Sequence, residues 1–168
     1  MNIKYMFDRH DITKYQFLKE FMEKAELKEI FMDFQKTDGK KDEDRENFWK
    51  IVLGVEGDGI WEKYCERIEK YLDVTLKKDR SAGTIFIDPD TGIKDKNSKK
   101  NEHLPEDELI RQVKENKDKT FIIYQHLSRT KFETAVLERL KMFKEKGVNA
   151  AVYHKTKEIY FIVISPTS

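Results

Sequence analysis

Short apolar runs alternate with longer amphipathic stretches along the chain, and this alternation predicts an α/β protein. Five runs rich in β-branched and aromatic residues are predicted to be strands: residues 28–34, 84–88, 120–124, 148–153 and 158–164. Before and between them, apolar residues recur at spacings of three and four, as they do on one face of a helix. The predicted helices cover about residues 11–25, 44–55, 58–72, 105–113 and 130–146.

The order of these elements predicts the topology of one sheet. Strands joined through a helix are expected to run parallel, whereas the last two, joined by residues 154–157, must pair antiparallel. The strand 158–164 is apolar at nearly every position, which favours a place inside the sheet. We therefore predict a single α/β domain over residues 1–168. It is a Rossmann-like three-layer sandwich with a mostly parallel sheet of about five strands and a C-terminal antiparallel hairpin.

Residues able to do chemistry follow two of the predicted strands. The run 84–88 ends in Asp88 and continues as Pro89-Asp90-Thr91-Gly92, and the run 120–124 continues as Gln125-His126-Leu127-Ser128-Arg129. In open α/β sheets ligands bind beyond the carboxyl ends of the strands, so a site is predicted where these two loops meet. Its candidate catalytic residues are Asp88, Asp90 and His126. Its candidate substrate-binding residues are Thr91, Gly92, Tyr124, Gln125 and Arg129.

The predicted site requires the two strands to be neighbours. Adjacent strands lie about 4.8 Å apart, so the Cα atoms of Asp88 and His126 are expected within roughly 5–10 Å of each other. Asp88 and Asp90 could serve as acid and base or hold a divalent cation. Alternatively, Asp88 caps local backbone amides and Asp90 makes an Asx turn before Gly92. His126 could be a general base, a metal ligand, a phosphate contact or a strand-end hydrogen-bonding residue. Arg129 could hold an anion with His126 or form a surface ion pair.

Two further polar residues open the first predicted helix. Asp11 and Lys14 could reach the same edge of the sheet as substrate-binding residues, or Asp11 could simply cap the helix. The lysine-rich stretch 94–100, which follows the paired acids, fits a lid, a phosphate-contacting arm or a solvated loop. The other histidines are His10, His103 and His154. Their spacing in the sequence does not suit binding of one metal ion, so no metal site is predicted from them.

The composition indicates which partners and which cellular compartment suit the protein, but it does not indicate a reaction. Charged residues make up 39% of the 168, but 33 basic and 32 acidic residues nearly cancel, so net charge favours neither nucleic acid nor membrane as a partner. The one cysteine, Cys65, excludes an internal disulfide and favours a reducing compartment. It falls on an apolar stripe, which predicts a small buried side chain rather than a nucleophile. With no signal peptide and no membrane-spanning run, we predict a cytoplasmic protein without a membrane partner.

The predicted architecture resembles the class I S-adenosylmethionine-dependent methyltransferase fold over nearly the whole chain. Asp88-Pro89-Asp90 stands where amino-methyltransferases carry an Asp-Pro-Pro-aromatic motif at the end of the fourth strand. The stretch from His10 to Tyr15 is similar to a segment that precedes the first strand in some bacterial ribosomal-RNA adenine methyltransferases. Phe86 to Gly92 and Tyr124 to His126 also resemble the Phe-x-Asp-Pro-Asp-x-Gly and Tyr-Gln-His motifs of an uncharacterised group of bacterial and phage proteins.

The chain departs from the methyltransferase pattern in several respects. The second and third strands of the family are missing, because residues 44–72 are predicted to be helical, and the acid that binds the cofactor ribose has no obvious counterpart. Only one glycine, Gly39, lies in the loop after the first predicted strand, where the family has a glycine-rich cofactor loop, and Thr91 replaces the motif aromatic. The resemblance therefore implies a degenerate methyltransferase-like protein, with S-adenosylmethionine as the cofactor of the family and a nucleotide or nucleic acid as substrate, bound between the Asp88–Gly92 and Gln125–Arg129 loops. Two alternatives stay open. They are a non-catalytic, phage-related binding or inhibitor protein, and a metal-dependent phosphodiesterase or nuclease that uses a divalent metal.

Overall fold

The computed structural model describes residues 9–34, 50–54, 59–89, 93, 104–126, 132–154, 156 and 159–166. The chain divides into two compact units. The first unit consists of residues 1–30 and 36–76, and the second unit consists of residues 31–35 and 77–168. The boundary passes through two strands, and the prediction of a single domain stays a prediction.

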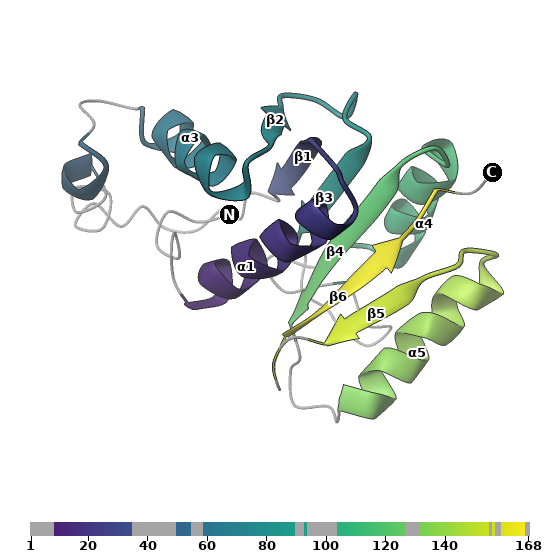
Figure 1. The fold of residues 1–168 in the computed structure, drawn as a ribbon. Coiled ribbons are helices and arrows are strands. Elements are labelled where there is room, and N and C mark those ends of the chain that lie inside the picture. The colour runs from purple at the N-terminus through teal and green to yellow at the C-terminus, as the bar shows by residue number, and fades with distance from the viewer. Residues whose placement is uncertain are drawn as a thin grey trace. The chain divides into compact units, whose positions relative to one another are not determined.

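Most of the predicted elements are present in the described residues (Figure 1). The helices are α1 (Arg9–Lys24), α3 (Ile60–Leu72), α4 (Glu106–Glu115) and α5 (Phe132–Glu145). The strands are β1 (Glu29–Phe34), β2 (Thr75–Lys77), β3 (Thr84–Asp88), β4 (Thr120–His126), β5 (Ala151–His154) and β6 (Ile159–Ile164). Of the helix predicted over 44–55, residues 50–53 are helical, and 44–49 and 55 lie outside the described residues.

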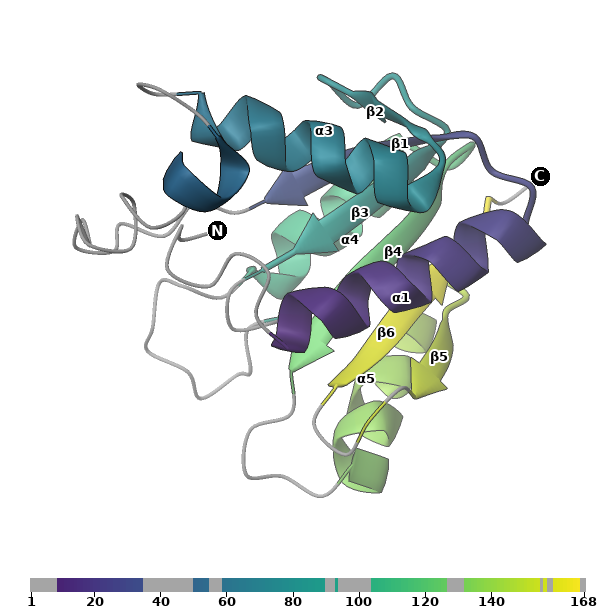
Figure 2. The same ribbon diagram turned by 60° about the vertical axis from the view of Figure 1, so that its left-hand side comes forward.

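The strands form one six-stranded mixed sheet in the order β2-β1-β3-β4-β6-β5. β3 pairs in parallel with both β1 and β4, whereas β6 is antiparallel to both of its neighbours, β4 and β5 (Figure 2). The C-terminal antiparallel hairpin and the interior place of the last strand are thus confirmed. The sheet is mixed, with β6 inserted antiparallel between β4 and β5, and it contains one strand, β2, that was not predicted. The mostly parallel character of the sheet and the three-layer arrangement stay predictions.

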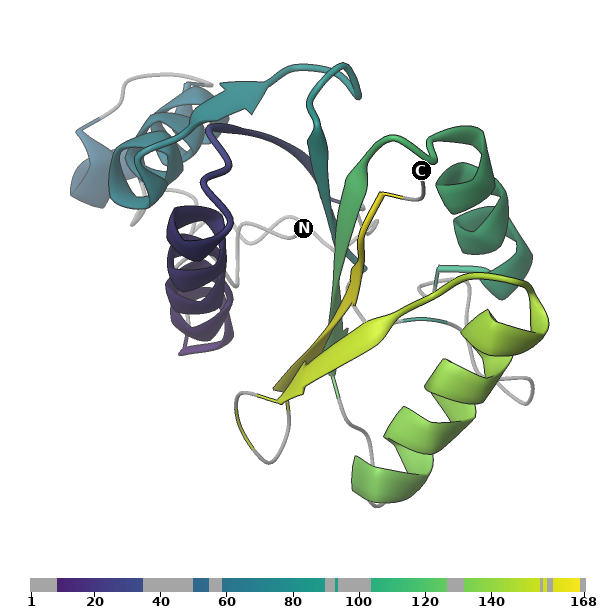
Figure 3. The same ribbon diagram turned by 45° about the vertical axis from the view of Figure 1, so that its right-hand side comes forward.

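The core of the second unit lies between its sheet and two helices on the same face, α4 and α5 (Figure 3). Alternate residues of β3, β4 and β6 point to this face and pack against the apolar sides of the helices. The fully or almost fully buried members of this cluster are Ile85, Ile87, Ile93, Leu104, Leu109, Phe121, Ile123, Phe143, Tyr160 and Ile162. The alternate residues on the other face, among them Phe86, Ile122 and Phe161, are buried as well.

Local sequence signals account for the ends of these two helices. Pro105 occupies the N-cap of α4 in an extended conformation, and acidic residues fill the first turn, where they interact favourably with the positive end of the helix dipole. Beyond the end of α5, Gly147 adopts a positive φ of 73°, as expected for a glycine that ends a helix.

The first unit contains α1 and α3, whose buried residues include Leu18, Ile68 and Leu72. α3 starts after Gly59, which provides no side-chain cap, and it ends at Asp73 in the left-handed conformation. The amide of Thr75 donates a hydrogen bond to the carbonyl of Lys28 across 2.9 Å. No described helix is long and apolar enough to span a bilayer.

Replacing Leu109 by alanine tests the core of the second unit. Leu109 in α4 is 0% exposed, so the substitution is expected to lower the free energy of unfolding by about 2–5 kcal/mol. Leu137→Ala is the matched control, because Leu137 in α5 is 67% exposed and should change stability by less than about 0.5 kcal/mol. Urea unfolding followed by circular dichroism measures both variants. Equal losses would contradict the assigned core.

Candidate functional site

The carboxyl ends of β3 and β4 meet at one edge of the sheet. The two strands are parallel neighbours, as predicted, with Thr84 opposite Thr120 and Ile87 opposite Ile123. Asp88 therefore lies one residue beyond the last of these pairs, and His126 lies three residues beyond it. With about 4.8 Å between strands and about 3.3 Å per residue, their Cα atoms are roughly 8 Å apart.

Side-chain alternation places Asp88 and His126 on the same face of the sheet. Ile85 and Ile87 point into the cluster under α4 and α5, so Asp88 points to the opposite face. In β4, Phe121 and Ile123 belong to that cluster, so Tyr124 and His126 also point away from it. Asp88 is 3% exposed and His126 is partly buried. A carboxylate, a phenol and an imidazole are thus brought together on one face at one edge.

Tyr124 is held in place by its neighbours in the sheet. It is 3% exposed, and its ring packs edge to face against Phe161, directly opposite on β6, with a centroid distance of 5.9 Å. Asp88 lies directly opposite Phe34, the last residue of β1. Across the sheet, Asp88 on β3 therefore lies between the last residue of β1 on one side and Tyr124 of β4 on the other.

Gln125 points to the other face and has a structural contact. Its side-chain oxygen accepts a hydrogen bond of 3.0 Å from the amide of Ile93, whose carbonyl in turn accepts one of 2.8 Å from Arg139. Ile93 and Leu104 are both buried and form an isolated parallel bridge. Gln125 thus connects the chain that follows the acidic loop to the sheet. Its predicted role in substrate binding stays a prediction.

One detail of the predicted site is corrected. Gln125 and His126 were expected in a loop, but β4 continues through both residues. The reason is the length of its partner, because β6 pairs with β4 as far as Tyr160 opposite Gln125 and Ile159 opposite His126. Four other predicted site residues lie outside the described part of the chain, and their roles stay predictions: Asp90, Thr91, Gly92 and Arg129.

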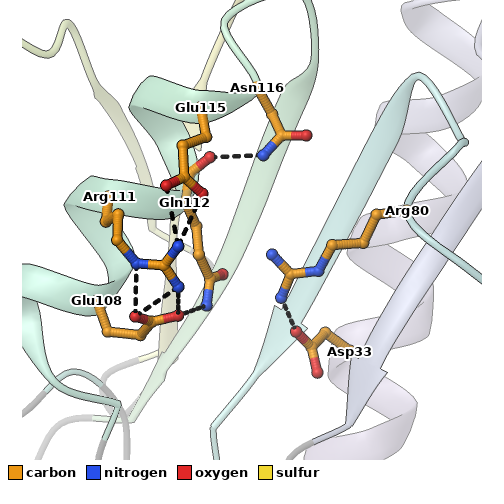
Figure 4. A network of polar contacts seen from close by, with 7 residues as sticks. All are labelled: Asp33, Arg80, Glu108, Arg111, Gln112, Glu115 and Asn116. Carbon is orange, nitrogen blue, oxygen red and sulfur yellow. Dashed lines mark hydrogen bonds and ion pairs between the residues drawn. The ribbon is translucent and has the colours of Figure 1, made fainter.

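Asp33, the acid near the end of β1, forms an ion pair with Arg80. Arg80 donates a hydrogen bond to Asp33 (Figure 4). The Arg80 guanidinium also lies 6.0 Å from the centroid of the Phe31 ring. Both charged side chains are partly exposed. Arg80 is held in turn by Lys119, whose ammonium donates to the Arg80 carbonyl. Asp33 is therefore committed to a structural contact on the helix-bearing face, away from Asp88.

A second network on the same face runs along α4 (Figure 4). Arg111 binds Glu108 at 2.7 Å and Glu115 at 2.9 Å, and Gln112 donates to Glu108 at 2.6 Å. These hydrogen bonds, first from Gln112 and then from Arg111, lower the pKa of Glu108 below its ordinary value. The residues are one helical turn apart, which makes the network a support for α4 itself.

The structure places Asp11 and Lys14 in a buried polar cluster within the first unit. The ammonium of Lys14 donates to one carboxylate oxygen of Asp11 across 3.3 Å, and the hydroxyl of Tyr64 donates to the other across 2.8 Å. Tyr15 is hydrogen-bonded to the same Tyr64 hydroxyl at 2.5 Å. These four residues, the Asp11 cluster, link α1 to α3, and each is at most 8% exposed.

No polar contact was predicted for the two tyrosines of the Asp11 cluster. Tyr15 and Tyr64 lie on the apolar stripes of their helices, 49 residues apart in sequence. The available signal was the hydroxyl itself, because a buried tyrosine nearly always has a hydrogen-bond partner. A buried carboxylate that accepts from both a lysine and a tyrosine is favourable only while each donor is present.

Tyr64→Phe tests the Asp11 cluster. It removes a hydroxyl that bridges Asp11 and Tyr15, so the free energy of unfolding should fall by about 1–3 kcal/mol. Tyr71→Phe is the matched control in the same helix, because Tyr71 is 46% exposed and should lose little stability. Chemical denaturation at neutral pH compares the two variants. If Tyr64→Phe is as stable as the unmodified protein, the cluster is not a stabilising contact.

The same cluster predicts a dependence of stability on alkaline pH. Burial raises the pKa of the Tyr64 hydroxyl far above its ordinary value of 10.0, and Tyr15 and Asp11 raise it further. Because only the unfolded chain releases this proton above pH 10, the stability from Tyr64 is complete below that pH and declines as pH rises. The unmodified protein should lose about 1.4 kcal/mol per pH unit more than Tyr64→Phe in this range. Parallel denaturation series between neutral and alkaline pH measure the difference, and identical slopes would contradict it.

Cys65 is not activated as a nucleophile. Its side chain is half-buried, and burial, with the carboxylates of Glu69 and then Glu62, raises the pKa of the thiol to about 11. We expect Cys65 to react with iodoacetamide at pH 8 about 100-fold more slowly than free cysteine, because its thiolate is correspondingly scarce. Mass spectrometry of the alkylated protein measures the rate. A rate equal to that of a free thiol would contradict this assignment.

The described residues contain no group of three or more histidine, cysteine, aspartate or glutamate side chains placed to hold a metal ion. No known protein-family profile matches the chain, and no curated protein matches it. Among solved structures, the chain is similar to the PH0226 protein from Pyrococcus horikoshii OT3 at 9% sequence identity. The match covers 96% of this chain and 94% of that chain, with a TM-score of 0.38. A TM-score this low does not establish a shared fold, so the methyltransferase resemblance stays a prediction.

Proposed function

We propose that the protein is a methyltransferase-like, Rossmann-like protein that binds a nucleotide, or a nucleotide within a nucleic acid, at the carboxyl edge of β3 and β4. The observation that carries the proposal is the parallel pairing of these strands, which brings Asp88, Tyr124 and His126 to one face of one edge. The terminal antiparallel hairpin, on which the resemblance to methyltransferases rests, supports it as well.

The strand order supports this location. β1 lies between β2 and β3, so the chain leaves β1 toward one side of the sheet and leaves β3 toward the other. Ligands of open α/β sheets bind outside the carboxyl ends at such a switch point. Asp88, directly opposite the last residue of β1, is the acid at that point.

Each residue has a role that suits a nucleotide. The Asp88 carboxylate accepts hydrogen bonds from a base amino group or a sugar hydroxyl, and it can also receive a proton. His126, further out along the same edge, contacts an anionic phosphate group in its charged form or acts as a base in its neutral form. Asp90 and Arg129 follow Asp88 and His126 closely in the sequence, and we propose that Asp90 helps to position the substrate and that Arg129 holds its anionic group.

The described residues do not favour S-adenosylmethionine as the bound cofactor. The acid that binds the cofactor ribose in the family has no counterpart matched in this sequence, and Asp33, the acid near the end of β1, is bound by Arg80. Gly39 and the rest of that loop lie outside the described residues. We therefore derive no methyl transfer and restrict the proposal to recognition of the nucleotide.

Calorimetry with AMP, ATP, S-adenosylmethionine and its homocysteine product tests the proposal. At least one should bind, and Asp88→Asn should weaken binding about tenfold or more, because an amide accepts fewer and weaker hydrogen bonds than a carboxylate. His126→Ala should weaken binding of ATP more than binding of a ligand without phosphate. Asp118→Asn, a change of the same kind in an exposed turn, serves as the control and should have no effect.

Other outcomes would favour the two alternatives. Absence of binding by all four ligands, with a normal unfolding transition, would overturn the proposal and favour a non-catalytic binding or inhibitor protein. Cleavage of labelled single- or double-stranded nucleic acid only when Mg²⁺ or Mn²⁺ is added, abolished by Asp88→Asn, would favour the metal-dependent phosphodiesterase.

A further inference from the structure

A basic depression lies at the opposite edge of the second unit from Asp88 and His126. It lies between the ends of α4 and α5 and the last residues of β6, and its empty space is about 360 Å³ when the adjoining open solvent is included. Lys119 lines it and directly precedes Thr120, the first residue of β4. Its lining residues are Val113, Lys114, Asn116, Lys117, Lys119, Gly147, Val148, Asn149, Ile164 and Ser165.

The lining of the basic depression carries three positive charges and no acidic side chain. Lys119 donates to the carbonyl of Arg80 and is therefore held in place. Lys114 and Lys117 form no ion pair with any residue that the structure describes. Asn149 and Ser165, both exposed, add an amide and a hydroxyl as neutral donors. In a chain with a net charge of only +1, this is a local excess of positive charge.

The negative ends of two helices balance only part of this positive charge. α4 and α5 both end at the depression, and the C-terminal end of a helix carries about half a negative charge. Two such ends are balanced by about one lysine, and three lysines line the depression. Asp118, which is exposed between Lys117 and Lys119, offsets about one more lysine, so a net positive charge of about one remains for an anionic ligand.

We propose that the basic depression binds a phosphate group, with Lys114 and Lys117 as the main contacts and Asn149 and Ser165 as neutral donors. Lysine suits this role, because its ammonium group is a mobile point charge that binds phosphate oxygens. The site is distinct from the nucleotide site. β4 spans seven residues, so its two ends lie roughly 20 Å apart, too far for one mononucleotide to fill both.

Titration of the isotope-labelled full-length protein with inorganic phosphate, at constant ionic strength, tests the proposal. Backbone amide resonances of residues 114–119 and 147–149 should shift in a saturable way, with half-saturation at roughly 1–10 mM. The double variant Lys114→Gln/Lys117→Gln should weaken binding about tenfold or more. The control Lys24→Gln/Lys70→Gln removes the same charge from exposed positions in the first unit and should change affinity less than about twofold.

A second titration, with a short single-stranded oligothymidylate, tests whether the bound phosphate group belongs to a nucleic acid or to a small phosphate compound. If it shifts the same amides with a half-saturation about tenfold lower than that of inorganic phosphate, the group belongs to a nucleic acid. Equal or weaker binding assigns the site to a small phosphate compound. Absence of saturable shifts with inorganic phosphate, or equal weakening by both double variants, would overturn the proposal. Asp88→Asn should leave these shifts unchanged, so failure here is separate from failure of the nucleotide site.

Discussion

The antiparallel insertion of β6 between β4 and β5 is the constraint on which the second unit depends. All six residues of β6 are buried, and they pair with the β4 residues from Phe121 to His126. This pairing keeps Tyr124 and His126 in regular strand geometry, and regular geometry is what places their side chains on the face of Asp88. Without β6, the end of β4 would be an edge of the sheet and its last two residues would lose their partners.

The interior of each unit is stabilised by a different kind of contact. The second unit buries an apolar cluster between sheet and helices, where stability grows with apolar area removed from water. In the first unit, α1 and α3 also share a carboxylate, an ammonium and two hydroxyls in the Asp11 cluster. Such a network adds geometric specificity, because each polar group tolerates few alternative arrangements once it is buried.

Local sequence patterns predicted the elements better than the contacts between them. Strand Thr84–Asp88 and helix Ile60–Leu72 were predictable because apolar periodicity and flanking glycine or acidic residues mark them. The extension of β4 through His126 was not, because it depends on Ile159 and Tyr160, more than 30 residues later. The three residues of β2 were too short to show a period, and the link from Asp11 to Tyr64 spans 53 residues. At the candidate site, the edge of the sheet and its two strands were predicted from the sequence. That Gln125 points to the other face from Tyr124 and His126 became clear only from the observed strand register.

The division of the chain has a consequence for dissecting the protein into fragments. The second unit includes residues 31–35, which are separated from the rest of it by more than 40 residues of the first unit. A fragment that starts at Lys77 would therefore lack β1 and leave β3 with an open parallel edge from Ile85 to Asp88. Unpaired edges of this apolar kind recruit other strands and promote aggregation. The second unit could be isolated intact only by a rearrangement of the gene that joins the β1 segment to the strands beside it, rather than by truncation.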